Sequence, residues 1–266
     1  MKNNFEILPI FFDIEKLQQA TNELFTKMSW KQHIVKGLCM TQIPDDSSSA
    51  DGDKLRGIFY TKPDSTGKEV PSVTNVLSST SDQSGIDEWK RRVGHEEAER
   101  ILQESSSIGS NVHNALENYL QDKEWEIIDD GSYISKTSIL ILDCFINNLV
   151  NDINEVWGLE VGLILDGLYA GTADCIGIYN GEESMIDFKT AKKVKPKEWI
   201  EDYFLQCSAY ANAHNVMYGT NINQIVILMV DRNQEYKKFV VKSREFDHYT
   251  NKWKRRLIKF HNKGNK

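Results

Sequence analysis

The 266-residue sequence has few cysteines and no paired cysteine motif. Its four cysteines, Cys39, Cys144, Cys175 and Cys207, are widely scattered, and no two of them form a Cys-x-x-Cys pair. This spacing argues against a zinc or iron–sulfur site and is typical of free thiols in a reducing compartment. The chain also has no Gly-x-x-x-x-Gly-Lys-Ser/Thr loop for binding nucleotide phosphates, so we expect neither an iron–sulfur cluster nor a nucleotide cofactor.

Long hydrophobic runs are absent as well. No apolar run approaches the roughly 18 residues that a membrane-spanning helix needs, and no apolar stretch of the kind found in signal peptides follows the first four residues. Hydrophobic residues make up 40% of the chain and charged residues 27%, which is enough apolar material for a sizeable core. We therefore expect a cytoplasmic protein without membrane partners, built as one catalytic core with additions.

Positive charge is scarce overall and concentrated at one end. The net charge is −7, but Tyr236–Lys266 carries eleven Lys or Arg against Glu245 and Asp247, so this segment is +9 and residues 1–235 are −16. Taken alone, a negative net charge counts against a protein that coats duplex DNA through phosphate contacts. The basic segment, with Trp253 and Phe260 interleaved, suits a helix that follows a nucleic-acid backbone. A solvated tail is an equally good interpretation.

The chain divides at about residue 67. Residues 1–67 form an accessory segment of unknown role, with an apolar start at 5–12, a helical pattern at 14–28 and an acidic serine-rich loop at 44–53. Residues 68–266 form the main domain. We expect this domain to comprise a helical wall at about 85–150, a catalytic core at about 155–245 and a basic helix at about 244–266.

Periodicity within this domain predicts an α/β (α+β) fold, in which helices flank a central mixed β-sheet behind an N-terminal helical extension. Gly109-Ser110 is expected to break the helical pattern, so that Ser110 caps a new helix carrying His113 and Glu117 one turn apart. The core order is α-β-β-β-α-β, and its first three strands form an antiparallel meander. The expected core elements are a helix at 137–151, strands at 157–165, 170–179 and 183–190, a helix between Pro196 and Gly219, and strands at 222–230 and 236–242.

The most informative motif is Asp187-Phe188-Lys189, which lies thirteen residues after Asp174 with an Asn180-Gly181 turn midway. A two-residue type I′ hairpin at this turn sets Asp174 opposite Asp187, with Lys189 on the same face. Opposed residues lie roughly 4.5–5.5 Å apart at Cβ, so two carboxylates there repel unless a cation lies between them. A hard divalent ion supplies that charge.

A surface hairpin with solvated charges is the structural alternative. Two features favour a buried metal site instead. Gly171 lets the backbone approach a ligand closely, and the reverse face carries apolar residues that must be buried. That apolar face comprises Ala173, Cys175, Ile186 and Phe188.

Further motifs appear in a fixed order along the chain. They are Pro71-Ser72-Val73-Thr74, Trp89, Gly109 to Glu117, Gly171-Thr172-Ala173-Asp174, Asp187-Phe188-Lys189-Thr190, and Gln206 with Tyr210. Between Pro71 and Lys242, about two thirds of the chain, this order resembles the RecB-like branch of the PD-(D/E)xK nuclease superfamily. Within it, the upstream motifs from Pro71 to Glu117 resemble the amino-terminal signature of the mitochondrial genome maintenance exonuclease group and its bacteriophage relatives. A phage-encoded protein would act in the host cytoplasm.

The resemblance implies a role for each matching residue. The implied metal ligands are Asp174, Asp187, the Phe188 carbonyl, His113 and Glu160. Lys189 would position the attacking water, and Gln206 and Tyr210 would hold the scissile phosphate or Lys189 itself. Further substrate contacts are expected at Thr172, Thr190, Lys192, Lys193, Lys252, Arg255 and Arg256.

Together these features predict a DNA exonuclease that depends on Mg²⁺ or Mn²⁺ and prefers single strands or flaps. Its partners would be DNA and proteins of replication, recombination or repair. One alternative is a structure-specific endonuclease or a subunit of a recombination complex. Another is a DNA-binding scaffold with a decayed site, although the intact Asp174, Asp187 and Lys189 argue against decay.

Overall fold

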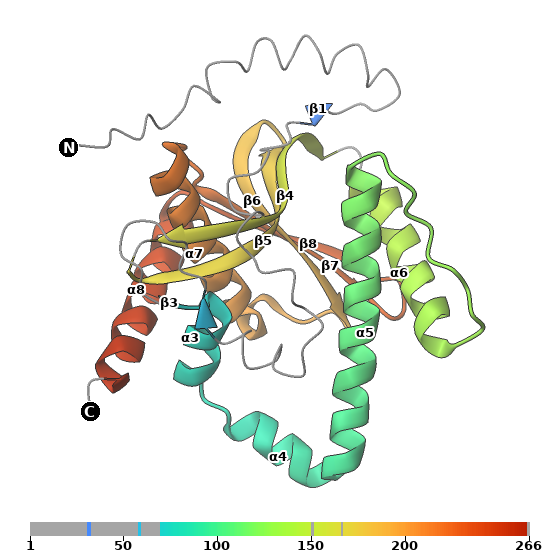
Figure 1. The fold of residues 1–266 in the computed structure, drawn as a ribbon. Helices are drawn as coiled ribbons and strands as arrows, with labels where there is room; N and C mark the ends of the chain where they lie inside the picture. Colours follow the sequence, from blue (N-terminus) through green and yellow to red (C-terminus); the bar gives the residue numbers. More distant parts are fainter. Residues whose placement is uncertain (1–30, 33–57, 60–69, 150–151, 166, 265–266) are drawn as a thin grey trace, which may run out of the picture.

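A computed structural model of the chain describes residues 31–32, 58–59, 70–149, 152–165 and 167–264 (Figure 1). The patterns at 5–12, 14–28 and 44–53 lie outside these residues, as does Cys39. The three other cysteines are free thiols. Within the described part of the chain, no helix is long and apolar enough to span a membrane.

The centre of the molecule is a mixed β-sheet with strand order β4-β5-β6-β7-β8 (Figure 1). Only β6 and β7 run parallel; the other neighbours among these five strands are antiparallel. The two-residue strand β1 (Lys31–Gln32) pairs in parallel with β4. The predicted sheet and its initial meander are confirmed. The long strands are β4 (Ile153–Leu165), β5 (Tyr169–Tyr179), β6 (Glu182–Ala191), β7 (Gln224–Asp231) and β8 (Tyr236–Lys242).

Helices cover both faces of this sheet, as Figure 1 shows. On one face lie α5 (His95–Leu120) and α6 (Tyr133–Leu149). On the other lie α3 (Val73–Thr80), α7 (Glu201–Tyr218) and α8 (Arg244–Gly264). The remaining elements are α4 (Ser84–Val93) between α3 and α5, the short 3₁₀ helix η2 (Lys197–Trp199), and a two-stranded sheet of β2 (Ile58–Phe59) with β3 (Val70–Pro71).

The sheet alternation sorts apolar side chains into two cores. Phe188 and Leu228 pack with the buried residues of α5 and α6. Met185 and Ile227, which point the other way, pack with α3, α7 and α8. Because successive strand residues face opposite sides, this sorting directs the even-numbered residues of β6 toward α5 and the odd-numbered ones toward α7.

The turn between β5 and β6 has the predicted geometry. Asn180 and Gly181 have φ of 49° and 82°, and a type I′ turn requires positive φ at both central residues. Cys175 pairs with Ile186, which is the predicted register. Asn at the first turn position and Gly at the second are the residues that adopt these angles most readily.

The predicted helix break at Gly109-Ser110 is wrong, because α5 runs without interruption from His95 to Leu120. A glycine inside a helix costs about 1 kcal/mol relative to alanine. The fully buried neighbours Ile108 and Val112 outweigh this cost through their packing. A Cβ at Gly109 would lie 3.6 Å from Thr190 Oγ1, so the small residue sits where α5 approaches β6.

Candidate active site

The site forms where β5 and β6 separate. Their backbone pairing ends at Cys175 and Ile186. Beyond this pair, a side chain replaces the backbone as the hydrogen-bond acceptor: Asp174 Oδ2 accepts a hydrogen bond of 2.9 Å from the Phe188 N–H. The carboxylate of Asp174 is thereby fixed beside β6, next to Asp187.

Asp187 and Lys189 form the deepest part of the site. Lys189 Nζ donates to Asp187 Oδ1 at 2.7 Å, and the side chain of Asp187 is only 3% exposed. The expectation of uncompensated repulsion between Asp174 and Asp187 is therefore wrong, since the Lys189 ammonium already supplies a positive charge. Asp187 Oδ2, by contrast, is buried and has no hydrogen-bond partner among the described residues.

Glu160 joins the site from β4. The register that pairs Leu159 with Cys175 and Val161 with Ala173 places Glu160 opposite Asp174. Glu160 has φ of 47°, a left-handed backbone conformation that residues other than glycine rarely adopt. Such strain costs of order 1–3 kcal/mol and is concentrated at functional sites.

At this conformation the alternation of side chains along β4 reverses, so that residues after Glu160 point to the opposite face of the sheet from the one expected. Leu159 belongs to the core under α5 and α6, whereas Val161, two residues later, belongs to the core under α7. The paired strand changes face at the same place, with Cys175 in the first core and Ala173 in the second. The prediction that Ala173 shares an apolar face with Cys175 is therefore wrong, because the alternation reverses at Glu160 and Asp174.

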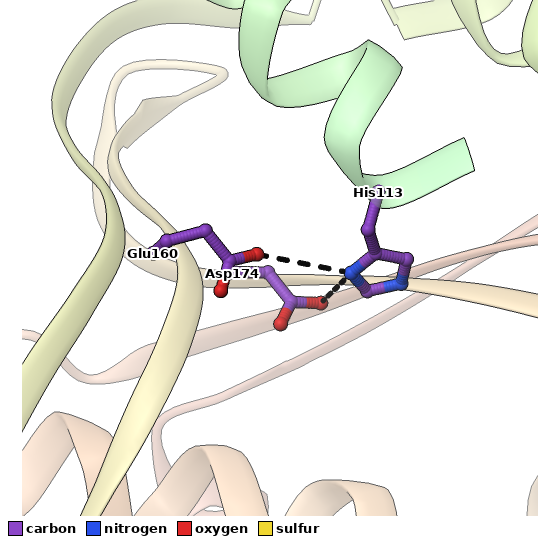
Figure 2. Close-up of side chains that lie close together, drawn as sticks. All are labelled: His113, Glu160 and Asp174. Carbon is purple, nitrogen blue, oxygen red and sulfur yellow. Dashed lines mark ion pairs between the residues drawn. The ribbon is translucent and has the colours of Figure 1, made fainter. Parts of the chain in front are cut away.

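His113 reaches the same point from α5 (Figure 2). Its Nδ1 lies 3.7 Å from Asp174 Oδ2 and 3.9 Å from Glu160 Oε1, and its Nε2 lies 2.9 Å from the Phe188 carbonyl oxygen. In the neutral tautomer with the proton on Nε2, the ring donates to this carbonyl and turns the Nδ1 lone pair toward the two carboxylates. Metal-binding histidines are commonly oriented in this way by a second hydrogen bond.

The three residues drawn in Figure 2 could hold a metal ion. One ligand atom from each of His113, Glu160 and Asp174 lies within 4.8 Å of the others. One imidazole nitrogen with carboxylate oxygens is a donor set that suits Mn²⁺ or Mg²⁺. Asp187 stands outside this set, but its unpaired Oδ2 gives the site a further oxygen in need of a partner. The residues present therefore fit a hard divalent ion.

Burial and charge shift the proton affinities of the site in consistent directions. Burial raises the pKa of Asp187 to about 7, against the opposing effect of the Lys189 charge. Burial lowers the pKa of Lys189, but the charges of Asp187 and Asp174 more than offset it, so the ammonium pKa is raised overall. Burial also raises the pKa of Glu160. For His113 burial lowers the pKa, and the neighbouring Glu160 and Asp174 reverse this, so the net shift is upward. A positive charge binding here would favour the ionised carboxylates.

Helix α7 closes the other side of the site. Gln206 Nε2 donates to Tyr210 Oη at 3.2 Å, so the two predicted residues do share a face. A Cβ on Gly171 would collide with the Tyr210 ring. Gly171 was predicted to admit a ligand, but the structure fills that space with Tyr210 instead.

Tyr203 was missed by the sequence interpretation. Lys189 Nζ lies 5.1 Å from the centroid of its ring, a cation–π arrangement. The signal that would have identified it is helical spacing, since Tyr203, Gln206 and Tyr210 occupy positions i, i+3 and i+7 of α7.

The residues predicted to contact substrate are distributed over several elements. Thr172 and Thr190 are partly buried in β5 and β6, and Lys192 and Lys193 are exposed just beyond β6. Those in α8 differ from one another. Lys252 pairs with Glu201, Arg255 is exposed, and Arg256 contacts α3 and Asp202.

Helix α8 is a packed element of the fold. Trp253 is 1% exposed and its ring meets that of Tyr169 at a centroid distance of 5.0 Å. Arg256 donates to the Leu77 carbonyl and to the Thr80 and Ser81 hydroxyls. These contacts complete the C-terminal end of α3.

Comparison with known proteins finds that this chain is similar to curated exonucleases. Its homologues are proteins named mitochondrial genome maintenance exonuclease 1. The human protein is 29% identical over 206 residues, which cover 72% of this chain and 58% of the human one. The Xenopus tropicalis protein is 29% identical over 73% of this chain and 58% of its own length, and the mouse protein is 30% identical over 64% and 53%.

The chain thus spans a little more than half the length of these curated relatives. No family model matches it. A solved structure of a provisionally assigned exonuclease from Eubacterium rectale is similar over 60% of this chain and 68% of its own, with 14% identity and a TM-score of 0.42.

Proposed function

We propose that the protein is a DNA exonuclease that requires Mg²⁺ or Mn²⁺ and acts on single strands or flaps in DNA replication, recombination or repair. The observation that carries the proposal is the convergence of His113, Glu160 and Asp174 beside the buried Asp187 and Lys189. Relatives named as exonucleases support the same activity.

The metal would be held by His113 Nδ1, Glu160, Asp174 and Asp187 Oδ2. An ion bound there would acidify its water and neutralise charge on the phosphate. The raised pKa of Lys189 keeps its ammonium protonated, so this residue would add a fixed positive charge aimed at the developing phosphorane. The ion pair with Asp187 holds the ammonium in place, and the Tyr203 ring lies against it.

The remaining residues would position these groups. His113, by donating to the Phe188 carbonyl, would lock α5 onto the catalytic strand and fix the imidazole. Gln206 and Tyr210, linked by a hydrogen bond, would orient a phosphate oxygen or Lys189. The exposure of the site rises from 3% at Asp187 to 36% at Glu160, so substrate would enter from the Glu160 side.

Digestion of end-labelled linear single strands and closed circular single strands, each with Mn²⁺, Mg²⁺ or chelator, tests the proposal. An exonuclease degrades the linear strand, spares the circle and stops in chelator. Cleavage of the circle would instead identify an endonuclease, and no cleavage of either would identify a scaffold. Asp174→Asn should abolish cleavage, whereas Asp143→Asn, which changes an exposed carboxylate on α6, should not.

A further inference from the structure

The connection between β6 and α7, residues Lys192–Trp199, is unusually basic. It carries Lys192, Lys193, Lys195 and Lys197 against a single Glu198 in a protein whose net charge is −7. It also begins three residues after Lys189, on the strand that carries the site. Any strand of nucleic acid held at Lys189 therefore lies close to this connection.

The backbone of this connection is fixed at both ends. The Val194 N–H donates to the buried carboxylate of Asp231 at 3.2 Å, and Asp231 is 1% exposed. At the other end the Trp199 N–H donates to the Pro196 carbonyl at 3.0 Å, and the next residue, Ile200, is 1% exposed in the core. The backbone that carries Lys195 and Trp199 is thus held by a hydrogen bond to a buried side chain before Lys195 and by the buried Ile200 after Trp199.

Trp199 is 77% exposed, whereas Trp253 is 1% exposed. An exposed tryptophan on an anchored backbone leaves a large π-face free for a planar ligand, and every nucleobase offers one. Successive bases of a single strand stack on such side chains while nearby cations contact the phosphates.

The lysines of the connection are not equivalent. Lys197 pairs with Glu245. Lys195 is exposed and takes no part in the ion pairs found among the described residues. Its Nζ lies 5.7 Å from the centroid of the Tyr203 ring, the same ring that Lys189 contacts at 5.1 Å. One aromatic ring therefore links the ammonium at the site to an available ammonium outside it.

We propose that Lys195 and Trp199 form a subsite for single-stranded nucleic acid next to the scissile phosphate. Lys195 contacts a phosphate that neighbours the one at Lys189, and Trp199 stacks on a base. Four residues of chain span at most about 14 Å, so both side chains can engage one short stretch of strand. This inference rests on the proposed nuclease function and names the part of the chain that holds its substrate.

Binding is best measured in the Asp174→Asn background, in which cleavage is expected to stop. Anisotropy of a labelled oligothymidylate should show that Trp199→Ala weakens binding about tenfold, equivalent to about 1.4 kcal/mol. Trp199→Phe should keep binding within about twofold, because phenylalanine also stacks. Lys195→Ala should weaken binding and lower the slope of log K against log salt by about 0.7, the value for one phosphate contact on a single strand.

Matched controls are Ile128→Ala and Lys136→Ala. Ile128 is 85% exposed and Lys136 is exposed on α6, the helix on the opposite sheet face. Neither variant should change affinity. A second readout is tryptophan fluorescence. The oligonucleotide should quench it in the Asp174→Asn protein but much less when Trp199→Phe is added to that protein, although the two proteins bind with similar affinity.

Activity separates this inference from the function on which it rests. With Asp174 intact, Trp199→Ala should raise KM for a linear oligonucleotide about tenfold and leave kcat within about twofold. If the parent cleaves single strands and Trp199→Ala has unchanged KM and affinity, the subsite is wrong and the nuclease assignment stands. If the parent neither binds nor cleaves single strands, the proposed function fails and the subsite fails with it.

Discussion

Lys189 Nζ lies 2.7 Å from Asp187 Oδ1, while Oδ2 of the same carboxylate is buried without a hydrogen-bond partner among the described residues. One oxygen of Asp187 is thus satisfied and the other is not. A buried oxygen left unpaired costs free energy, and an ion bound to this oxygen would supply the missing partner. This asymmetry supports the proposal that Asp187 binds a divalent ion together with His113, Glu160 and Asp174.

The three charged residues of the motif should each be essential. We expect Asp174→Asn, Asp187→Asn and Lys189→Ala to reduce cleavage of linear single strands by more than about 100-fold, the size of effect seen when one transition-state contact is removed. Initial rates with end-labelled DNA would measure this. Lys237→Ala, which removes an exposed lysine on β8, is the control. A near-normal rate in any of the three would remove that residue from the mechanism.

Gly171 should tolerate no side chain. In Gly171→Ala the new Cβ meets the buried Tyr210 ring, so the ring must move from the position in which it bonds Gln206. Overpacking of this kind costs about 1–3 kcal/mol. We expect a lower melting temperature and slower cleavage. Gly85→Ala in α4 is the matched control, since a Cβ there meets nothing within 4 Å and alanine favours the helix; equal melting temperatures for the two variants would contradict the packing described.

The adjacent arginines of α8, Arg255 and Arg256, should differ in their contribution to the stability of the fold. Arg256→Ala removes charged hydrogen bonds to the Leu77 carbonyl and to the Thr80 and Ser81 hydroxyls, so we expect a loss of about 3 kcal/mol in unfolding free energy. Arg255→Ala, at an exposed position, should leave stability within about 0.5 kcal/mol. Urea denaturation measures both. Equal stability of the two variants would show that Arg256 does not hold α3.

A pH dependence should follow from His214, which lies outside the site. Burial lowers its pKa from 6.5 to about 4 in the folded protein. Between pH 4 and pH 6.5 His214 is protonated in the unfolded chain but not in the folded protein. The contribution of neutral His214 to the free energy of unfolding is therefore complete above pH 6.5 and declines as the pH falls toward 4. The loss is about 3 kcal/mol. Urea titrations across this range should show a shallower decline in His214→Asn; identical slopes would mean that His214 ionises freely in the fold.

Local sequence signals predicted the hairpin well. Asn180 and Gly181 adopt the two positive φ angles that this turn needs, and strand alternation then fixes which side chains share a face. The succession of strands along the chain and the end of α7 at Gly219 were predictable for the same reason. The expected helix start at Pro196 is wrong, because Pro196 precedes the 3₁₀ helix η2 and α7 begins at Glu201.

Features that depend on distant residues were not predictable. The reversal of the sheet at Glu160 requires a left-handed glutamate, which no local propensity favours. The continuity of α5 through Gly109 depends on packing against the sheet, which cannot be predicted from the helix propensity of the nearby residues. The pairing of Asp187 with Lys189 was open to prediction, because strand alternation places the two side chains on one face of β6.

Thermal melting of the parent and Asp187→Asn, in chelator and with Mn²⁺, tests the metal site most directly. In chelator the variant should melt lower than the parent, because Lys189 loses its buried partner. With Mn²⁺ at a hundredfold excess over its dissociation constant, the parent should gain about 2.7 kcal/mol, and the variant much less. Equal gains in the two proteins, or none in the parent, would contradict a divalent ion at Asp187.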